Sequence, residues 1–200
     1  MAGSAATFGE GERGAVGVLE TGLISNINDI QLYEAKARGV SNKSAELILS
    51  DNSMQTHVSQ FGVGTYKRAH RHGPGSHVLV LGGVGYTLLW NNEPQYSKAA
   101  KQVRVDWTDG TLLVPPDRWF HQHFNAGSTS AKYMATTWIG GKYWVKALGG
   151  GGRTHRLNTT SFRQGGNMVD YPDEDPMVRS MFDEELKKHG VQNLMPSKKG

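Results

Sequence analysis

Histidines are the residues of this sequence that are best suited to chemistry. Eight of them occur among 200 residues. His70 and His72 are separated by one residue, as are His121 and His123. On a β-strand each pair faces one side, because side chains alternate with a period of two. Two imidazoles on an inward face can chelate one metal ion. His77 lies close behind the first pair, so these two short segments hold five histidines.

The composition restricts what else the chain can be. The sequence contains no cysteine, which excludes disulfides, thiolate metal sites and a cysteine nucleophile. Any metal ion must therefore be bound by His, Asp or Glu. Lys and Arg total 22 against 18 Asp and Glu, a net charge of +4, but the basic residues are scattered. A nucleic-acid partner would need them gathered on one face, so we expect none.

The sequence also lacks the usual signals for a membrane or for secretion. It has no apolar run of the roughly 18 residues that cross a bilayer. Its first residues have neither a basic start nor an apolar stretch, so we expect no secretory signal, and we expect a cytoplasmic protein.

The elements that must position the histidines are expected to be strands. Short segments rich in β-branched and aromatic residues recur over residues 45–148, separated by Gly, Pro and Asn/Asp clusters. This pattern predicts an all-β fold, an antiparallel sandwich or barrel. Both histidine pairs lie inside this region, in GTYKRAHRH and in WFHQHFN.

The regions on either side of this barrel are expected to be different. Residues 1–44 predict an N-terminal arm with a short helix over Asp29–Arg38, which Gly39 would end. Residues 149–200 predict a glycine linker and a C-terminal helical tail. The tail helix should begin after Asp175, and Gly190 should end it. We expect this helix to cover an outer face of the barrel or a neighbouring subunit.

Strand alternation also selects candidate substrate contacts. Tyr66 and Arg68 would share the face of His70 and His72, and Arg68 could bind a carboxylate or form a surface ion pair. His123 would share the face of His121 and carry a proton, or only orient its neighbour. We expect Trp119 and Trp138 to wall an aromatic pocket or to belong to the core. These candidates are Tyr66, Arg68, Trp119 and Trp138 for substrate binding, with Arg68 and His123 in catalysis.

Two stretches of the sequence resemble the motifs of the cupin family. The first runs from Gly64 through His70 and His72, past a Gly-Pro-Gly turn, to the Gly83–Gly85 turn. The second begins at Gly110 and continues through two prolines to His121 and Asn125. The motifs with their flanking strands cover about half of the chain. The resemblance implies a cupin barrel over 45–148, which is a jelly-roll barrel, also called a double-stranded β-helix. It does not name a reaction, because cupins have many chemistries.

The resemblance implies that His70, His72 and His121 bind a metal ion. The glutamate that cupins usually add should lie four or five residues after His72, where this chain has Ser76 and His77. Either the site has three histidines with open positions, or His77 is a fourth ligand; we include His77 among the candidate metal ligands. The usual glycine after the prolines of the second motif is also missing, and Arg118 lies near its place.

A site without a carboxylate resembles that of the gentisate-type ring-cleaving dioxygenases among the cupins. This resemblance implies a mononuclear non-haem Fe(II) dioxygenase that acts with O2 on a small aromatic or enolisable organic acid. It also implies a homodimer or higher homo-oligomer, with the chain either a one-domain relative or the C-terminal half of a double cupin beside a partner cupin chain. The alternatives are a Mn-, Ni- or Zn-dependent isomerase, decarboxylase or lyase, and a non-catalytic small-molecule binder.

Overall fold

The structure is a computed structural model that describes residues 4–8, 16–49, 54–73, 75–91, 102–137 and 159–196. Its strands are β1 (Ser4–Phe8), β2 (Val16–Thr21), β3 (Tyr33–Glu34), β4 (Lys43–Leu49), β5 (Gln55–Phe61), β6 (His77–Gly82), β7 (Gly85–Trp90), β8 (Gln102–Trp107), β9 (Leu112–Leu113), β10 (Phe120–Asn125) and β11 (Ala131–Thr137). Its helices are the short 3-10 turns η1 (Lys36–Arg38), η2 (Phe162–Gln164) and η3 (Tyr171–Asp173), and the α-helix α3 (Pro176–His189). The all-β prediction is confirmed.

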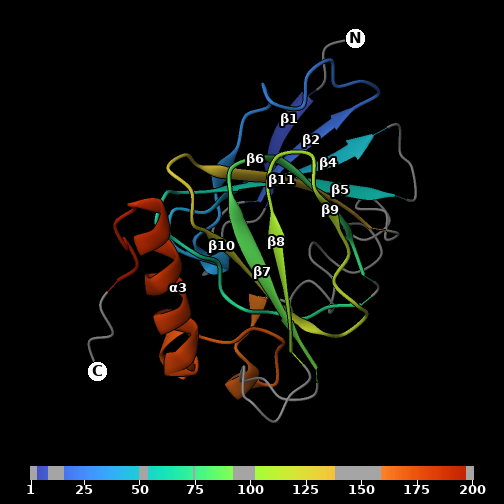
Figure 1. Cartoon of the computed structure of the whole chain (residues 1–200). Coiled ribbons are helices and arrows are strands. Elements are labelled where there is room, and N and C mark those ends of the chain that lie inside the picture. The colour runs from blue at the N-terminus through green and yellow to red at the C-terminus, as the bar shows by residue number, and fades with distance from the viewer. Residues whose placement is uncertain are drawn as a thin grey trace.

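The strands form two sheets (Figure 1). The larger sheet has eight strands in the order β1-β2-β4-β5-β11-β6-β9, with β3 paired to β4. The smaller sheet has the order β10-β7-β8. Pairing within the described strands is antiparallel, except that β2 and β4 run parallel. The strands β1, β2 and β3 lie in the region predicted as an arm, and they extend the large sheet.

The small sheet is covered on both of its faces. Every residue of β7 and of β10 is buried. Tyr86 and Phe124 face outward into an apolar cluster that includes Phe182 of α3. His121 and His123 alternate with these outward residues, so they face the large sheet. The sheet therefore separates an outer apolar region from an inner space that holds histidines.

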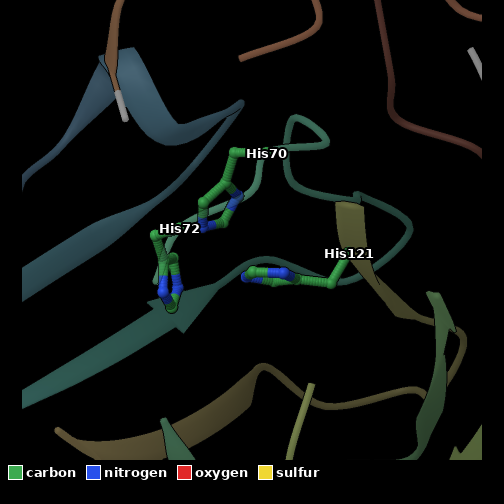
Figure 2. Close-up of side chains that lie close together, drawn as sticks. All are labelled: His70, His72 and His121. Atoms are coloured by element: carbon green, nitrogen blue, oxygen red, sulfur yellow. The ribbon is translucent and has the colours of Figure 1, made fainter. Parts of the chain in front are cut away.

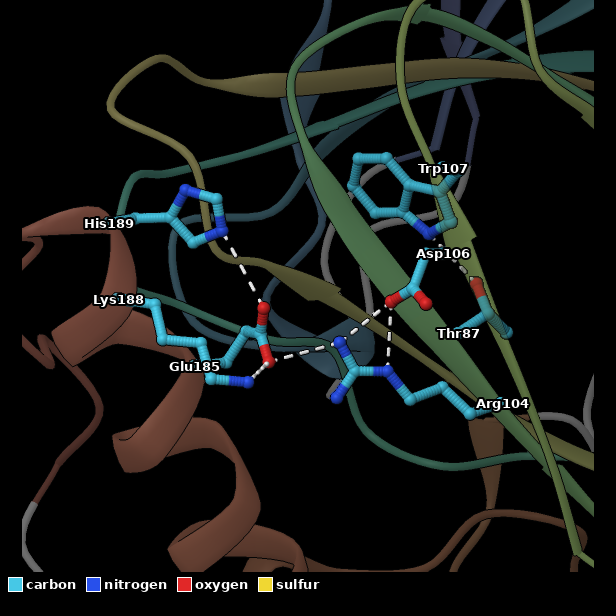
Figure 3. Close-up of polar contacts among 7 residues, drawn as sticks. All are labelled: Thr87, Arg104, Asp106, Trp107, Glu185, Lys188 and His189. Atoms are coloured by element: carbon cyan, nitrogen blue, oxygen red, sulfur yellow. Dashed lines mark hydrogen bonds and ion pairs between the residues drawn. The ribbon is translucent and has the colours of Figure 1, made fainter.

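The C-terminal helix α3 begins and ends where its caps predict. The Asp175 side chain accepts a hydrogen bond from the backbone N–H of Met177, and Gly190 ends the helix in the left-handed conformation with φ 64°. The helix lies beside β7 and β10 (Figure 1). Arg104 of β8 forms an ion pair with Glu185 of α3, with 3.0 Å between Nη2 and Oε2 (Figure 3). None of the described helices is long and apolar enough to cross a membrane.

The helix predicted over Asp29–Arg38 is absent. The structure has the two-residue strand β3 and the single 3-10 turn η1 in its place. Tyr33 and Glu34 pair with Ser44 and Lys43 of β4, so their backbone groups join the sheet instead of a helix. The carboxylate of Asp29 accepts from the Asn26 side chain and caps no helix. Backbone pairing with the edge of β4 is thus favoured over the helix with which the local sequence pattern is compatible.

Candidate metal centre

Three histidines from the two motif segments converge in the space between the sheets (Figure 2). His70, His72 and His121 each offer one ring nitrogen, and these three atoms lie within 4.8 Å of one another. The ring centroids of His70 and His121 are 4.3 Å apart, and those of His72 and His121 are 4.8 Å apart. The cluster is the only grouping of three or more potential metal ligands found in the described residues.

Backbone pairing and ring hydrogen bonds fix the directions of two of these imidazoles. His70 and His121 exchange backbone hydrogen bonds, with N···O distances of 3.1 and 2.8 Å. The Nδ1 atoms of His70 and His121 lie 3.2 and 3.1 Å from the carbonyl oxygens of Arg68 and Trp119. A carbonyl can only accept, so both Nδ1 atoms carry the proton and both Nε2 atoms keep a free lone pair. Metal-ligating histidines typically donate a hydrogen bond from the ring nitrogen that does not bind the metal. The donor set of this cluster therefore fits a divalent metal ion.

The surroundings of the cluster keep His70 and His121 uncharged. Burial, and then the other histidines and Arg38, lower the pKa of His70 well below its usual value. Burial and the neighbouring His72 and His123 do the same to the pKa of His121. A neutral imidazole is the form that binds a metal ion. These two imidazoles are therefore ready to bind a metal ion at neutral pH without first losing protons.

The three histidines line one part of a partly open cavity of about 50 Å³. Its wall is mostly polar, and it combines residues of both sheets with residues of the connecting segments. The lining residues are Arg38, Ser44, Glu46, His57, Ser59, Lys67, His70, His72, Ser76, Val78, Pro115, His121, His123, Tyr133 and Ala135.

A one-residue bulge precedes His70 and overturns the predicted strand face. The segment 64–72 makes isolated bridges in place of a regular strand. Lys67 donates its backbone N–H to His123, and His70 pairs with His121. Three steps along this segment therefore match two steps along β10, which is the geometry of a β-bulge. Lys67 lines the cavity as a result, while Arg68 lies outside it.

Tyr66 and Arg68 are consequently not brought into the cavity, contrary to the prediction that they contact substrate. The Tyr66 hydroxyl donates to Glu174 with 2.9 Å between the oxygens, and its ring packs against Phe182. The Arg68 guanidinium lies 3.5 Å from the carboxylate of Asp170 and over the ring of Tyr171. Of the two roles expected for Arg68, the structure shows the ion pair.

His77 is not part of the cluster, and the expectation of a fourth imidazole ligand is corrected here. Its side chain is exposed at the start of β6, where Val78 faces inward. Alternation then turns His77 outward and brings Ser76 to the cavity wall. The site has three histidines and no carboxylate ligand, the arrangement that leaves coordination positions open.

His123 faces the cavity, whereas Trp119 does not line it. Nδ1 of His123 lies 2.8 Å from the Thr87 hydroxyl, which also accepts from Nε1 of Trp107 at 3.0 Å (Figure 3). Burial, followed by the charge of Lys67, lowers the pKa of His123 to about 3. The side chain of Trp119 is not in the lining of the described cavity. Trp138 lies outside the described residues.

Lys67 of the first motif segment and its partners across the cavity, Ser59 and Tyr133, were missed by the sequence analysis. Lys67 donates to Ser59 with 2.8 Å between Nζ and Oγ, and to Tyr133 with 2.6 Å between Nζ and the hydroxyl. Burial and the nearby Arg38 lower the pKa of Lys67. Burial raises the pKa of Tyr133 to about 12. Alternation along AKYMATT, with Ala131, Tyr133 and Ala135 inward, was the signal that could have found Tyr133.

Arg38 reaches the cavity because the chain after η1 passes very close to residues 66–68. Gly39 bridges to Lys67, and Arg68 donates its backbone N–H to the carbonyl of Arg38 at 3.0 Å. A Cβ on Gly39 would lie 2.8 Å from the Tyr171 hydroxyl and 3.1 Å from Cα of Lys67, so only glycine fits. No sequence signal pointed to Arg38, because its position depends on these long-range contacts.

Known proteins give only distant likenesses. The sequence matches no protein-family model, and no curated protein matches it. A mutant of Bacillus subtilis oxalate decarboxylase is similar over 57% of this chain and 29% of its own, at 10% identity and a TM-score of 0.46. The formate complex of Lactobacillus farciminis oxalate decarboxylase is similar over 57% and 32%, at 15% identity and a TM-score of 0.44.

A third solved structure comes from a protein with a different recorded activity. Peruvianin-I, a cysteine peptidase from Thevetia peruviana latex, is similar over 58% of this chain and 71% of its own, at 12% identity and a TM-score of 0.48. The matched part of this chain spans less than a third of the two decarboxylases. Similarity at this level assigns neither a family nor an activity to this chain.

Proposed function

We propose that this chain is a cupin-type metalloenzyme, specifically a mononuclear non-haem Fe(II) dioxygenase that acts on a small aromatic or enolisable organic acid. One observation carries the proposal: in the described part of the chain three imidazoles converge with no carboxylate ligand, and His77 is turned away. Three neutral ligands leave the full charge of a divalent ion for an anionic substrate and leave positions open on the ion. A fourth histidine ligand would have left fewer open coordination positions on the ion.

Different residues of the cavity would perform the separate steps of such a reaction. His70, His72 and His121 would hold the ion. Bound Fe(II) would supply positions for a chelating acid and for O2, and would carry electron transfer between them. The Thr87 hydroxyl holds His123 through Nδ1, so its Nε2 is the nitrogen left to exchange a proton with a ligand. The buried walls exclude bulk water, which strengthens each of these polar interactions.

The same donor set supports a second candidate. Three imidazoles also suit Mn, Ni and Zn, and a Lewis acid at this site could serve an isomerase, decarboxylase or lyase. Here too the acid would bind to the ion, but no O2 would be consumed. The third possibility is a binder of small molecules that has no reaction to catalyse. Metal identity and oxygen consumption separate the three.

The test begins with the metal content of protein purified without a metal-affinity column. Mass spectrometry should find about one iron per chain, and oxygen uptake should occur with a member of a panel of hydroxybenzoates and diketones. The His70→Ala and His121→Ala variants should lose both the bound iron and the oxygen uptake. His77→Ala is the matched control, because it removes an imidazole outside the cluster, and it should lose neither.

Other results would redirect the proposal. Stoichiometric zinc, nickel or manganese without oxygen uptake would support the Lewis-acid candidate. Protein that binds no metal ion would contradict both enzymatic functions and leave a small-molecule binder.

A further inference from the structure

The wall of the cavity contains a buried guanidinium atom that lacks a partner. Nη1 of Arg38 is inaccessible to solvent and has no hydrogen-bond partner. A buried donor on a charged group is costly when left unpaired, so such atoms are rare unless a ligand or ion pairs with the group. Arg38 also lines the cavity that the three histidines line. Arg38 thus combines an unpaired buried donor with a place in the cavity wall, where a bound anion could pair with its guanidinium.

The other polar groups of this wall leave Nη1 of Arg38 without a hydrogen-bond partner. Glu46 is the only carboxylate among the residues that line the cavity. Its Oε2 accepts from Gln55 with an N···O distance of 2.6 Å, and burial raises its pKa, whereas that hydrogen bond and the charges of Arg38 and Lys67 lower it. Lys67 is bonded to the hydroxyls of Ser59 and Tyr133. The described wall thus sets one carboxylate against two basic side chains, and a bound anion would balance the remaining positive charge.

The size of the cavity limits the ligand that can use this charge. An apolar cavity of roughly 150 Å³ accepts benzene, whereas a single water needs roughly 10–15 Å³. This cavity has about 50 Å³. That space fits a few heavy atoms beside a metal ion, and a benzene ring with its substituents would have to extend through the open side of the cavity.

We propose that the cavity binds a compact aliphatic acid of two to four carbons, whose carboxylate pairs with the guanidinium of Arg38 while a second oxygen function faces the three histidines. This inference rests on the proposed function and narrows its substrate class from aromatic or enolisable acids to compact acids. Arg38 is a binding residue in this arrangement. Its charge and the charge of the metal ion attract the two ends of one small anion.

The test is calorimetric titration of the zinc-loaded protein with three probes. Pyruvate is compact and anionic, pyruvamide has nearly the same shape without the charge, and salicylate adds a ring to a similar chelating pair of oxygens. Pyruvate should bind at least tenfold more tightly than either of the others. Arg38→Gln should weaken pyruvate binding at least tenfold and leave zinc content unchanged.

The matched control is Lys36→Gln, which removes a positive charge from the same 3-10 turn at an exposed position. It should leave pyruvate binding unchanged. Equal binding of pyruvate and salicylate, or equal pyruvate affinity in Arg38→Gln and wild type, would overturn the proposal. If Arg38→Gln does not fold, the three probes on wild-type protein still decide the size limit and the need for charge.

Failure of this inference differs from failure of the proposed function. Zinc that binds without any preference for pyruvate contradicts the compact-acid site alone. A protein that takes up no metal ion contradicts the proposed function. In that second case, pyruvate binding to the metal-free protein that disappears in Arg38→Gln would still support an anion site at this wall.

Discussion

The two faces of the small sheet differ in what their side chains do. The inner face contributes His121 and His123 to a polar cavity with an unpaired guanidinium atom. The outer face contributes Phe124 to an apolar cluster, where the ring of Phe182 packs 5.7 Å from it between centroids. The outer cluster buries apolar surface and should supply stability. The inner cavity buries polar groups at a cost, and such costly groups are expected where a protein binds or reacts.

The largest expected effect comes from emptying the outer cluster. Phe182 is fully buried against Tyr66 and Phe124. Phe182→Ala should lower the free energy of unfolding by roughly 3–5 kcal/mol, because it removes apolar contacts and leaves a cavity. Urea denaturation measures the loss. The folded fraction should keep its metal content, and a loss of metal in that fraction would mean that the two faces are not independent.

The inner face should make stability depend on pH in the metal-free protein. Burial holds His123 neutral by lowering its pKa to about 3, whereas an unfolded histidine titrates near 6.5. The unfolded chain therefore binds more protons between these values, and stability is lost as the pH falls from 6.5 towards 3. His123 should contribute about 1.4 kcal/mol per pH unit, or roughly 3 kcal/mol between pH 6.5 and 4.5.

Urea denaturation at several pH values between 7 and 4.5 measures this slope. His70 and His121 should add to it in the same direction, because their pKa values are also lowered by burial. His123→Gln should make the slope shallower. The same slope in this variant and in wild type would refute a buried neutral His123.

A smaller effect should follow from disturbing the chain that carries Arg38. A methyl group at residue 39 would lie too close to Tyr171 and Lys67, and φ at Gly39 is 144°. Gly39→Ala should cost roughly 1–3 kcal/mol of unfolding free energy and displace Arg38. It should therefore also weaken pyruvate binding, measured by calorimetry. Gly110→Ala has open space around the new methyl and controls for the strain of a positive φ alone.

The smallest effect should come from the hydrogen bond that joins Trp107 of β8 to Thr87, which lies beside His123. Trp107→Phe removes the indole N–H that donates to Thr87 (Figure 3). It should cost roughly 1–2 kcal/mol, because one hydrogen bond and a few buried ring atoms are lost. Thermal unfolding is sensitive enough to measure it. An unchanged unfolding temperature would show that this hydrogen bond does not stabilise the fold.

The sequence predicted best what depends on neighbouring residues. The caps of α3, Asp175 and Gly190, lie directly beside the helix that they bound, and the helix begins and ends at them. The histidine spacing likewise fixed which imidazoles could meet, and three of the four predicted ligands do meet. The predicted homo-oligomer, partner cupin chain and cytoplasmic location stay predictions.

The sequence failed where one residue or one distant contact decides the outcome. Strict alternation assigned Tyr66 and Arg68 to the cavity, but the bulge places Lys67 there. Nothing in the order of these residues marks the bulge, because it is visible only in the pairing with β10. Arg38 lies in a segment whose pattern is compatible with a helix, so its place in the cavity wall could not be predicted. Its position depends on residues such as Tyr171, more than 100 positions further along the chain.

The hydroxyl of Tyr171 ties two distant segments together, since it accepts from the backbone N–H of Val40 and donates to the carbonyl of Tyr66. During synthesis on the ribosome, this link can form only after Tyr171 has been added to the chain. His121 leaves the ribosome about 50 residues before Tyr171 does, which takes roughly 3–10 s at the usual speeds of translation. All three histidines are thus outside before the residue that fixes the Arg38 wall exists. A metal ion can reach them in that interval, so loading of the metal can precede closure of the cavity around it.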